Sequence, residues 1–226
     1  MKPATLIVLA LAGCSAAPER PATHSIRGTV RYLGTRPKPK TYNFPGYPEL
    51  PPGGIPREDL VLDGQGGVKN AVVYVAGLEG TAPPPETPVV LEVQGLRYDP
   101  HVLALQVGQE LIVHNRDSGL HHVHFIPERN PVSMFGIPKD DPRRITFVQP
   151  EVGMRVQCGI HPWMRAYVAV LDHPFFAVTD EQGRFEIRDL PPGKVTVRVW
   201  HEKLQADDQQ VDVRREAPVN FVGTPK

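Results

Sequence analysis

The sequence predicts an all-β protein. Its 226 residues include 26 prolines and 20 glycines, which interrupt helices and favour turns. The stretches between them alternate apolar and polar side chains with the two-residue period of a strand, and none keeps a helical period between capping residues. Short strands that follow one another without helices are typical of a Greek-key sandwich or barrel. The length is enough for one or two domains with cores of their own.

The densest run of predicted strands covers residues 89–172. The strands expected in it are 89–93, 102–107, 111–115, 122–126, 145–148, 155–158 and 166–171. Two strands are predicted ahead of it, at 26–34 and 71–75, and those predicted after it are 175–179, 184–188, 194–201, 210–213 and 219–222. Residues 35–58 are dominated by proline, glycine and charge, and we expect a long irregular excursion over the surface. The proline-rich stretch 81–88 predicts a stiff connector and marks the clearest domain boundary.

The charge balance argues against two classes of partner. Lysine plus arginine and aspartate plus glutamate both number 25, so the formal net charge is zero. A chain with this balance shows no electrostatic preference for nucleic acid or for an anionic membrane surface.

The N-terminus has the features of an export signal over residues 1–14. Lys2 supplies a positive start, and the apolar run 6–11 is too short to span a bilayer. Leu-Ala-Gly-Cys at 11–14 resembles the bacterial lipobox, which implies that Cys14 becomes the lipidated first residue of an exported protein anchored in the cell envelope. The alternative is an ordinary cleaved signal with an incidental cysteine. Residues 15–25 have little apolar bulk and are expected to form a flexible tether.

A candidate metal site lies in the loop Cys158-Gly-Ile-His161-Pro-Trp-Met164. A thiol, an imidazole and a thioether are three of the four ligands of a trigonal His2Cys copper site with a long axial methionine. The fourth should be a histidine from the cluster Leu-His-His-Val-His-Phe at 120–125. The structural alternative is that Cys158 is a buried small hydrophobe and Met164 is core filler. The joint spacing favours a metal, and lipidation of Cys14 would leave Cys158 without a disulfide partner.

Two segments, 115–125 and 158–164, resemble the ligand segments of the cupredoxins, most closely the amicyanin-like branch. The resemblance covers about residues 89–172 and implies a Greek-key barrel with one type 1 copper. The equatorial ligands it implies are His121, Cys158 and His161, with Met164 as the axial ligand. Such a site leaves no open coordination position, so it suits electron transfer and argues against catalysis at the metal.

One position departs from that family. An Asn often follows the first histidine ligand and influences the cysteine sulfur, whereas this chain has His122. We expect His122 and Asn115 to lie beside the ligands without binding the metal. Strand alternation puts His122 and His124 on the face opposite His121, and a one-residue shift in register would change the ligand. A second, weak metal site at His122 and His124 is an open alternative.

Pro162 and Trp163 lie next to a ligand that must approach the surface if electrons are to enter. They are expected to form an apolar docking patch for a redox partner; the alternative is that Trp163 packs the loop. The zero net charge argues against strong electrostatic steering of that partner.

The flanks resemble carboxypeptidase-regulatory-like (transthyretin-like) sandwiches. The segments that carry the resemblance are 26–30, 70–75, 179–185 and 190–194. We expect residues 26–88 and 173–226 to form one small β-sandwich with the cupredoxin segment inserted between its strands. That family supplies structural or binding modules without catalytic residues, and His201 is expected to be a packed or hydrogen-bonded residue.

These features together predict an exported blue-copper protein that carries one electron between envelope partners and is not an enzyme. Two alternatives remain open at this point. One is an envelope binding module in which the cupredoxin segment is scaffold; the other is copper storage or delivery.

Overall fold

The computed structural model describes residues 24–78, 82–215 and 217–226. The predicted signal peptide, Cys14 and most of the predicted tether lie outside these residues. Every regular element among the described residues is a β-strand, so the all-β prediction is confirmed. The described residues contain no helix long and apolar enough to cross a membrane.

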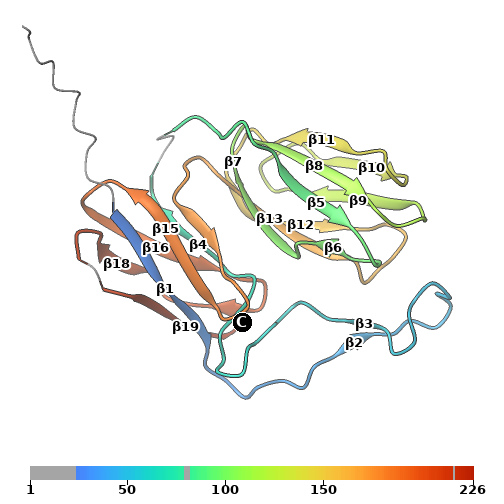
Figure 1. The fold of residues 1–226 in the computed structure, drawn as a ribbon, viewed down its shortest axis with the longest axis horizontal. Helices are drawn as coiled ribbons and strands as arrows, with labels where there is room; N and C mark the ends of the chain where they lie inside the picture. The colour runs from blue at the N-terminus through green and yellow to red at the C-terminus, as the bar shows by residue number, and fades with distance from the viewer. Residues whose placement is uncertain (1–23, 79–81, 216) are drawn as a thin grey trace, which may run out of the picture.

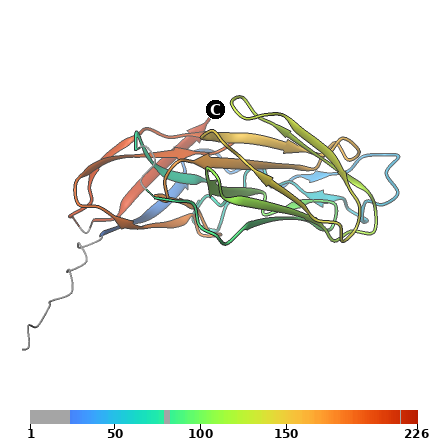
Figure 2. The same ribbon diagram turned by 90° about the horizontal axis from the view of Figure 1, so that it is seen from above.

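The strands form two sandwiches that lie along the long axis of the molecule (Figures 1 and 2). The central sandwich packs a sheet in the order β10-β9-β12-β13-β7 against a sheet in the order β11-β8-β5-β6. Its strands are β5 (Val89–Val93), β6 (Tyr98–Asp99), β7 (Val102–Gln106), β8 (Glu110–Asn115), β9 (His121–Ile126), β10 (Ser133–Ile137), β11 (Arg143–Thr146), β12 (Glu151–Gln157) and β13 (Arg165–Leu171). All of them come from one continuous stretch of chain.

The flanking sandwich takes strands from both ends of the described chain. Its sheets have the orders β15-β1-β19-β17 and β14-β4-β16-β18. The strands are β1 (His24–Tyr32), β4 (Val72–Ala76), β14 (Phe176–Val178), β15 (Arg184–Leu190), β16 (Lys194–Trp200), β17 (Leu204–Gln205), β18 (Gln209–Asp212) and β19 (Val219–Pro225). The central strands therefore interrupt this sandwich between β4 and β14.

An apolar junction joins the two sandwiches. Val72 from the flanking sandwich packs with Val102, Ala169 and Leu171 from the central one, and all four are buried. Trp200 also lies in this cluster, and its indole is so close to Gly153 that a Cβ at that glycine would lie 2.5 Å from the indole nitrogen. The junction is thus closely packed, as a core is.

Polar side chains add to this junction. The imidazole of His101 pairs with Glu202, whose second oxygen accepts a hydrogen bond of 3.2 Å from the hydroxyl of Tyr167. Burial, together with the charge of Glu202, raises the pKa of Tyr167 to about 12. This hydroxyl stays protonated and remains a donor across neutral pH, which fixes one sandwich against the other.

Residues 41–56, called the strap below, form a separate arm. The strap begins at β2 (Thr41–Tyr42) and ends at β3 (Ile55–Pro56), which pair with each other in a two-stranded sheet. In Figure 1 this arm leaves the flanking sandwich and runs beside the end of the central one. Its apolar side chains pack against the central core; they are Tyr42, Phe44, Tyr47, Leu50 and Ile55.

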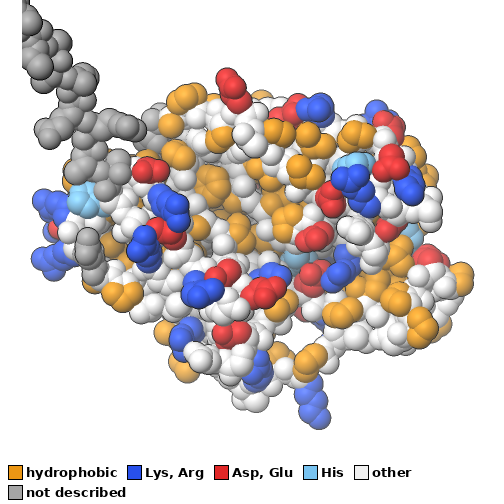
Figure 3. Space-filling view, in the orientation of Figure 1, with side chains coloured by type: hydrophobic (Ala, Val, Ile, Leu, Met, Phe, Trp, Pro, Cys, Tyr) orange, Lys and Arg blue, Asp and Glu red, His pale blue; other side chains and the backbone are white. Residues whose placement is uncertain are grey.

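The strap differs in one respect from the expected surface excursion. Proline, glycine and charge do make it irregular, but its aromatic side chains cover the core of another unit. Strand β10 was not predicted, and the two-residue strands β2, β3, β6 and β17 were also missed. Acidic and basic side chains are interspersed among apolar ones on the face shown in Figure 3, in keeping with the zero net charge.

Candidate metal centre

Three predicted ligands meet at one end of the central sandwich. His121 is the first residue of β9, and Cys158 and His161 lie in the loop between β12 and β13. Their donor atoms all lie within 4.8 Å of one another. The Nδ1 atoms of the two imidazoles are 3.1 Å apart, and the sulfur of Cys158 is 3.6 Å from Nδ1 of His161. All three side chains are buried, so the donors form a small enclosed cluster.

The loop from Cys158 to Met164 is closed by its own backbone. The amide of Cys158 donates to the carbonyl of Met164 over 3.3 Å, and the amide of Met164 donates to the carbonyl of His161 over 3.0 Å. Met164 is 2% exposed and packs in the same core as Cys158. Because adjacent strands hold both ends of this loop, its donors have little freedom to move apart.

The sulfur of Cys158 accepts two backbone hydrogen bonds. The donors are the amides of His122 and Ile160, each 3.4 Å from the sulfur. Donors of this kind stabilise a thiolate, which is the form of cysteine that binds metals. The carbonyl of His122 in turn accepts a hydrogen bond of 2.6 Å from the hydroxyl of Tyr98, which fixes that peptide.

His122 therefore acts on the sulfur through its backbone. Its imidazole lies over the ligand loop, where a Cβ added to Gly159 would be 3.0 Å from Nδ1 of His122. Side chains in β9 alternate between buried and half-buried, with His121 facing inward and His122 and His124 facing outward. The cluster of His121, Cys158 and His161 is the single group of three or more His, Cys, Asp or Glu donors within such reach in the described chain.

Asp117 contacts His121 at Nε2, the ring nitrogen that faces away from the other donors. Its carboxylate lies 3.1 Å from Nε2 of His121 and also accepts the amides of Gly95 and Leu96 over 2.7 and 2.9 Å. A proton on Nε2 that bonds to Asp117 leaves Nδ1 free to face Cys158. Burial lowers the pKa of His121, and the neighbouring His161 lowers it further, against an opposing effect of Asp117. The neutral imidazole that a metal requires is thereby favoured.

Asn115 shapes the turn that carries Asp117. This fully buried side chain donates to the carbonyls of Gly119 and Ile137 over 2.8 and 2.9 Å. Its oxygen accepts the amide of Asp117 over 2.9 Å. Asn115 thus lies beside the ligands, as expected, and its contribution is to position the carboxylate behind His121.

Glu49 holds the outer edge of His161, and sequence reasoning missed it. The carboxylate of Glu49, from the strap, lies 3.3 Å from Nε2 of His161. The ring of Tyr47 lies 6.5 Å from that of His161, centre to centre. Asp117 was missed as well, although its place between Asn115 and His121 offered a local signal. Glu49 offered none, because only the fold brings the strap to the ligand loop.

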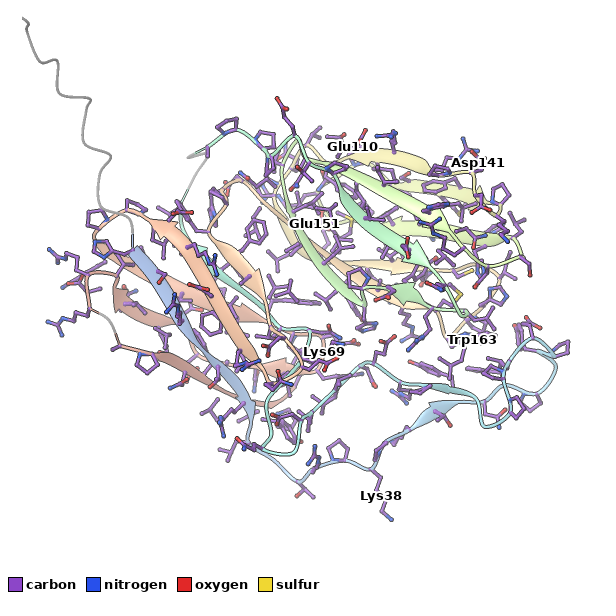
Figure 4. All side chains as sticks on the ribbon, in the orientation of Figure 1. Lys38, Lys69, Glu110, Asp141, Glu151 and Trp163 are labelled. Atoms are coloured by element: carbon purple, nitrogen blue, oxygen red, sulfur yellow. The ribbon has the colours of Figure 1, made fainter. Side chains whose placement is uncertain are left out.

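Trp163 is buried and does not form a docking patch. Its ring stacks on Phe44 at 5.5 Å, meets Tyr47 edge-on at 4.8 Å, and its indole nitrogen donates to the carbonyl of Leu96 over 3.1 Å. Figure 4 places Trp163 at the end of the central sandwich that faces the strap. Only 3% of Trp163 is exposed, so the expected apolar patch is reduced to the exposed Pro162. Packing of the loop, the stated alternative, is what the structure shows.

No family model and no curated protein matches the sequence. Part of the fold is similar to solved structures of low sequence identity. A copper-containing nitrite reductase from Thermus scotoductus SA-01 shares 27% identity over 43% of this chain and 25% of its own, with a TM-score of 0.35. Amicyanin from Paracoccus versutus shares 21% over 43% of this chain and 96% of its own, with a TM-score of 0.34. A purple cupredoxin from Nitrosopumilus maritimus shares 21% over 36% of this chain and 98% of its own, with a TM-score of 0.31. The match thus spans a quarter of the nitrite reductase and nearly all of the two small cupredoxins.

Proposed function

We propose that this chain is an exported copper protein that carries one electron at a time. One observation carries the proposal: the Nδ1 atoms of two imidazoles and a cysteine sulfur converge in a buried cluster whose outer edges are held by carboxylates. Nitrogen and thiolate donors in this combination suit copper, and Met164 would supply a further, soft donor from the same loop. Bound copper would supply one-electron exchange between its Cu(I) and Cu(II) states.

The residues around the donors favour electron transfer over other uses of a metal. Strands β9, β12 and β13 hold the ligands, and Asp117 and Glu49 fix the orientation of both imidazoles. A rigid donor set rearranges little when the charge on the metal changes, which keeps exchange fast. His121 is 0% exposed and Cys158 is 6% exposed, so little of either ligand faces the solvent from which a substrate would bind. We therefore propose an electron carrier and not an enzyme.

The location of the protein is part of the proposal. The N-terminal 14 residues direct export, and a lipid on Cys14 anchors the chain in the cell envelope through the tether of residues 15–25. The partners are redox proteins of the same compartment, and the balanced charge offers nothing to nucleic acid.

The visible spectrum of the copper-loaded protein tests the function. The mature chain is incubated with Cu(II), freed of excess metal and scanned. An intense thiolate-to-copper band in the red is expected, and Cys158→Ser should abolish it because the sulfur is its source. His24→Gln, which changes a histidine far from the loop, serves as the matched control and should leave the band intact.

Two other results would replace this proposal. A wild-type protein that stays colourless with Cu(II) would favour an envelope binding module that uses the central sandwich as scaffold. A coloured protein that gives up copper to a mild chelator within minutes would favour storage or delivery.

A further inference from the structure

We propose that a hollow beside the two imidazoles is the electron port, and that its partner is a redox protein presenting a lysine or arginine there. This inference rests on the proposed function. The hollow has a volume of about 350 Å³, and the residues that line it are Glu49, Leu96, Asp117, Ser118, Gly119, Leu120, His121 and His161. This hollow therefore borders both ligand imidazoles.

The strap determines where this opening lies. Phe44 and Tyr47 cover Trp163, so the side of the loop that carries this tryptophan is closed. On the other side, Leu120 is 50% exposed and Glu49 has 38% of its side chain exposed. A partner that reaches His161 must therefore approach between the strap and the turn of residues 117–120.

The charge of the hollow selects the partner. Two carboxylates line it, and no lysine or arginine is among its lining residues. Asp117 and Glu49 lie 3.1 and 3.3 Å from the outer nitrogens of His121 and His161, so each carboxylate connects a ligand to the rim of the hollow. A cationic side chain seated in the hollow would contact carboxylates that lie directly beside the ligand imidazoles. Because the net charge of the chain is zero, the attraction between these carboxylates and a cationic partner acts only at short range. Its effect on the rate of association is therefore modest.

Electron exchange with two small oxidants of opposite charge tests the port. The reduced, copper-loaded protein is mixed in a stopped-flow instrument with a cationic cobalt(III) phenanthroline complex or with anionic hexacyanoferrate(III). The ratio of the cation rate to the anion rate is the readout, because a changed reduction potential moves both rates in the same direction. We expect this ratio to fall between about 0.01 M and about 1 M ionic strength, as the screening length shortens from about 30 Å to about 3 Å.

Two variants locate the effect. Glu49→Gln should lower the ratio about threefold at low salt, because one carboxylate leaves the rim. Leu120→Lys should lower it as well, since it adds a positive charge at an exposed position and leaves the strap contacts intact. Glu58→Gln is the matched control: Glu58 pairs with Arg97 at 3.8 Å, does not line the hollow, and its loss should leave the ratio unchanged.

The outcomes separate the two proposals. A blue wild-type protein whose rate ratio is unaffected by salt, by Glu49→Gln and by Leu120→Lys would overturn the port and leave the electron-carrier function standing. A wild-type protein that yields no thiolate–copper band would overturn both.

Discussion

The Nε2 atom of His161 lies 3.3 Å from a carboxylate oxygen of Glu49. The pair mirrors His121 and Asp117, whose corresponding distance is 3.1 Å. One carboxylate belongs to the turn before β9, whereas the other arrives on the strap. The two carboxylates beside the proposed copper ligands therefore come from segments that are far apart in the sequence.

Replacement of Glu49 by glutamine should raise the reduction potential. A carboxylate on the outer nitrogen of His161 increases the electron density of the imidazole and favours the more highly charged oxidised state. Loss of that charge should reduce the stabilisation of the oxidised state by about 1 kcal/mol, which raises the reduction potential by about 40 mV for one electron. Voltammetry of the loaded protein measures the shift, and Glu58→Gln is the control that should keep the wild-type potential. A potential equal to that of wild type in Glu49→Gln would show that the contact does not tune the metal.

Truncation of Phe44 to alanine should loosen the strap. The variant loses the stack on Trp163 and leaves apolar surface of the ligand loop uncovered. We expect a loss of about 1–2 kcal/mol in strap docking and faster protease cleavage within residues 43–54. Val132→Ala, at a site that is 70% exposed and directly precedes the edge strand β10, should cleave at the wild-type rate. Equal cleavage of both variants would argue against a docked strap.

Substitution of His122 by asparagine should leave the thiolate–copper band nearly unchanged. The hydrogen bond to the sulfur of Cys158 comes from the backbone amide of residue 122, which the substitution preserves. Gly159→Ala is the informative comparison. Its new Cβ would lie 3.0 Å from Nδ1 of His122 and must displace either the ring or the loop, so we expect this band to shift. The opposite pattern in the visible spectra would mean that the imidazole of His122 controls the sulfur.

His201 should make stability depend on pH in weakly acidic solution. This side chain is 2% exposed, and burial lowers its pKa from 6.5 to about 4. The unfolded chain takes up a proton below about pH 6.5, while the folded chain resists uptake until about pH 4. The stabilising contribution is therefore complete above pH 6.5 and is lost as the pH falls towards 4, by at most about 3 kcal/mol. Urea denaturation at pH 7 and pH 4.5 measures it: His201→Gln should show a smaller decline than wild type, and His24→Gln the same decline as wild type.

Most of the strands could be predicted because their side chains alternate between the core and solvent. Strand β9 shows this, with His121, Val123 and Phe125 buried and the residues between them half-buried. Strand β10 was missed because Gly136 and the exposed Met134 break its apolar pattern, and its position at the edge of a sheet demands little burial. The short strands β2 and β3 have no period to detect.

The candidate ligands followed from spacing because a hairpin loop places Cys158, His161 and Met164 together whatever surrounds them. The surroundings could not be predicted in the same way. The burial of Trp163 and the contact between His161 and Glu49 both depend on the strap, which lies more than a hundred residues upstream of the ligand loop. Neither Trp163 nor Glu49 carries a local sign of its partner. Trp163 beside a ligand was compatible with an exposed patch or with packing, and only the position of Phe44 and Tyr47 decides between them.

The interrupted flanking sandwich has a consequence for the order in which the chain can fold during synthesis. Strand β1 pairs with β19, and a side-chain hydrogen bond in this pair joins Thr29 to Asn220 across 191 residues. When a ribosome has made the first half of the chain, β1 and β4 exist without the partners β15, β16 and β19. The central sandwich can close on itself first, and its completion brings the ends of the gap together, which shortens the loop that β1 and β19 must close. Slow closure of the central sandwich would thus prolong the time that unpaired strand edges of its neighbour are open to aggregation.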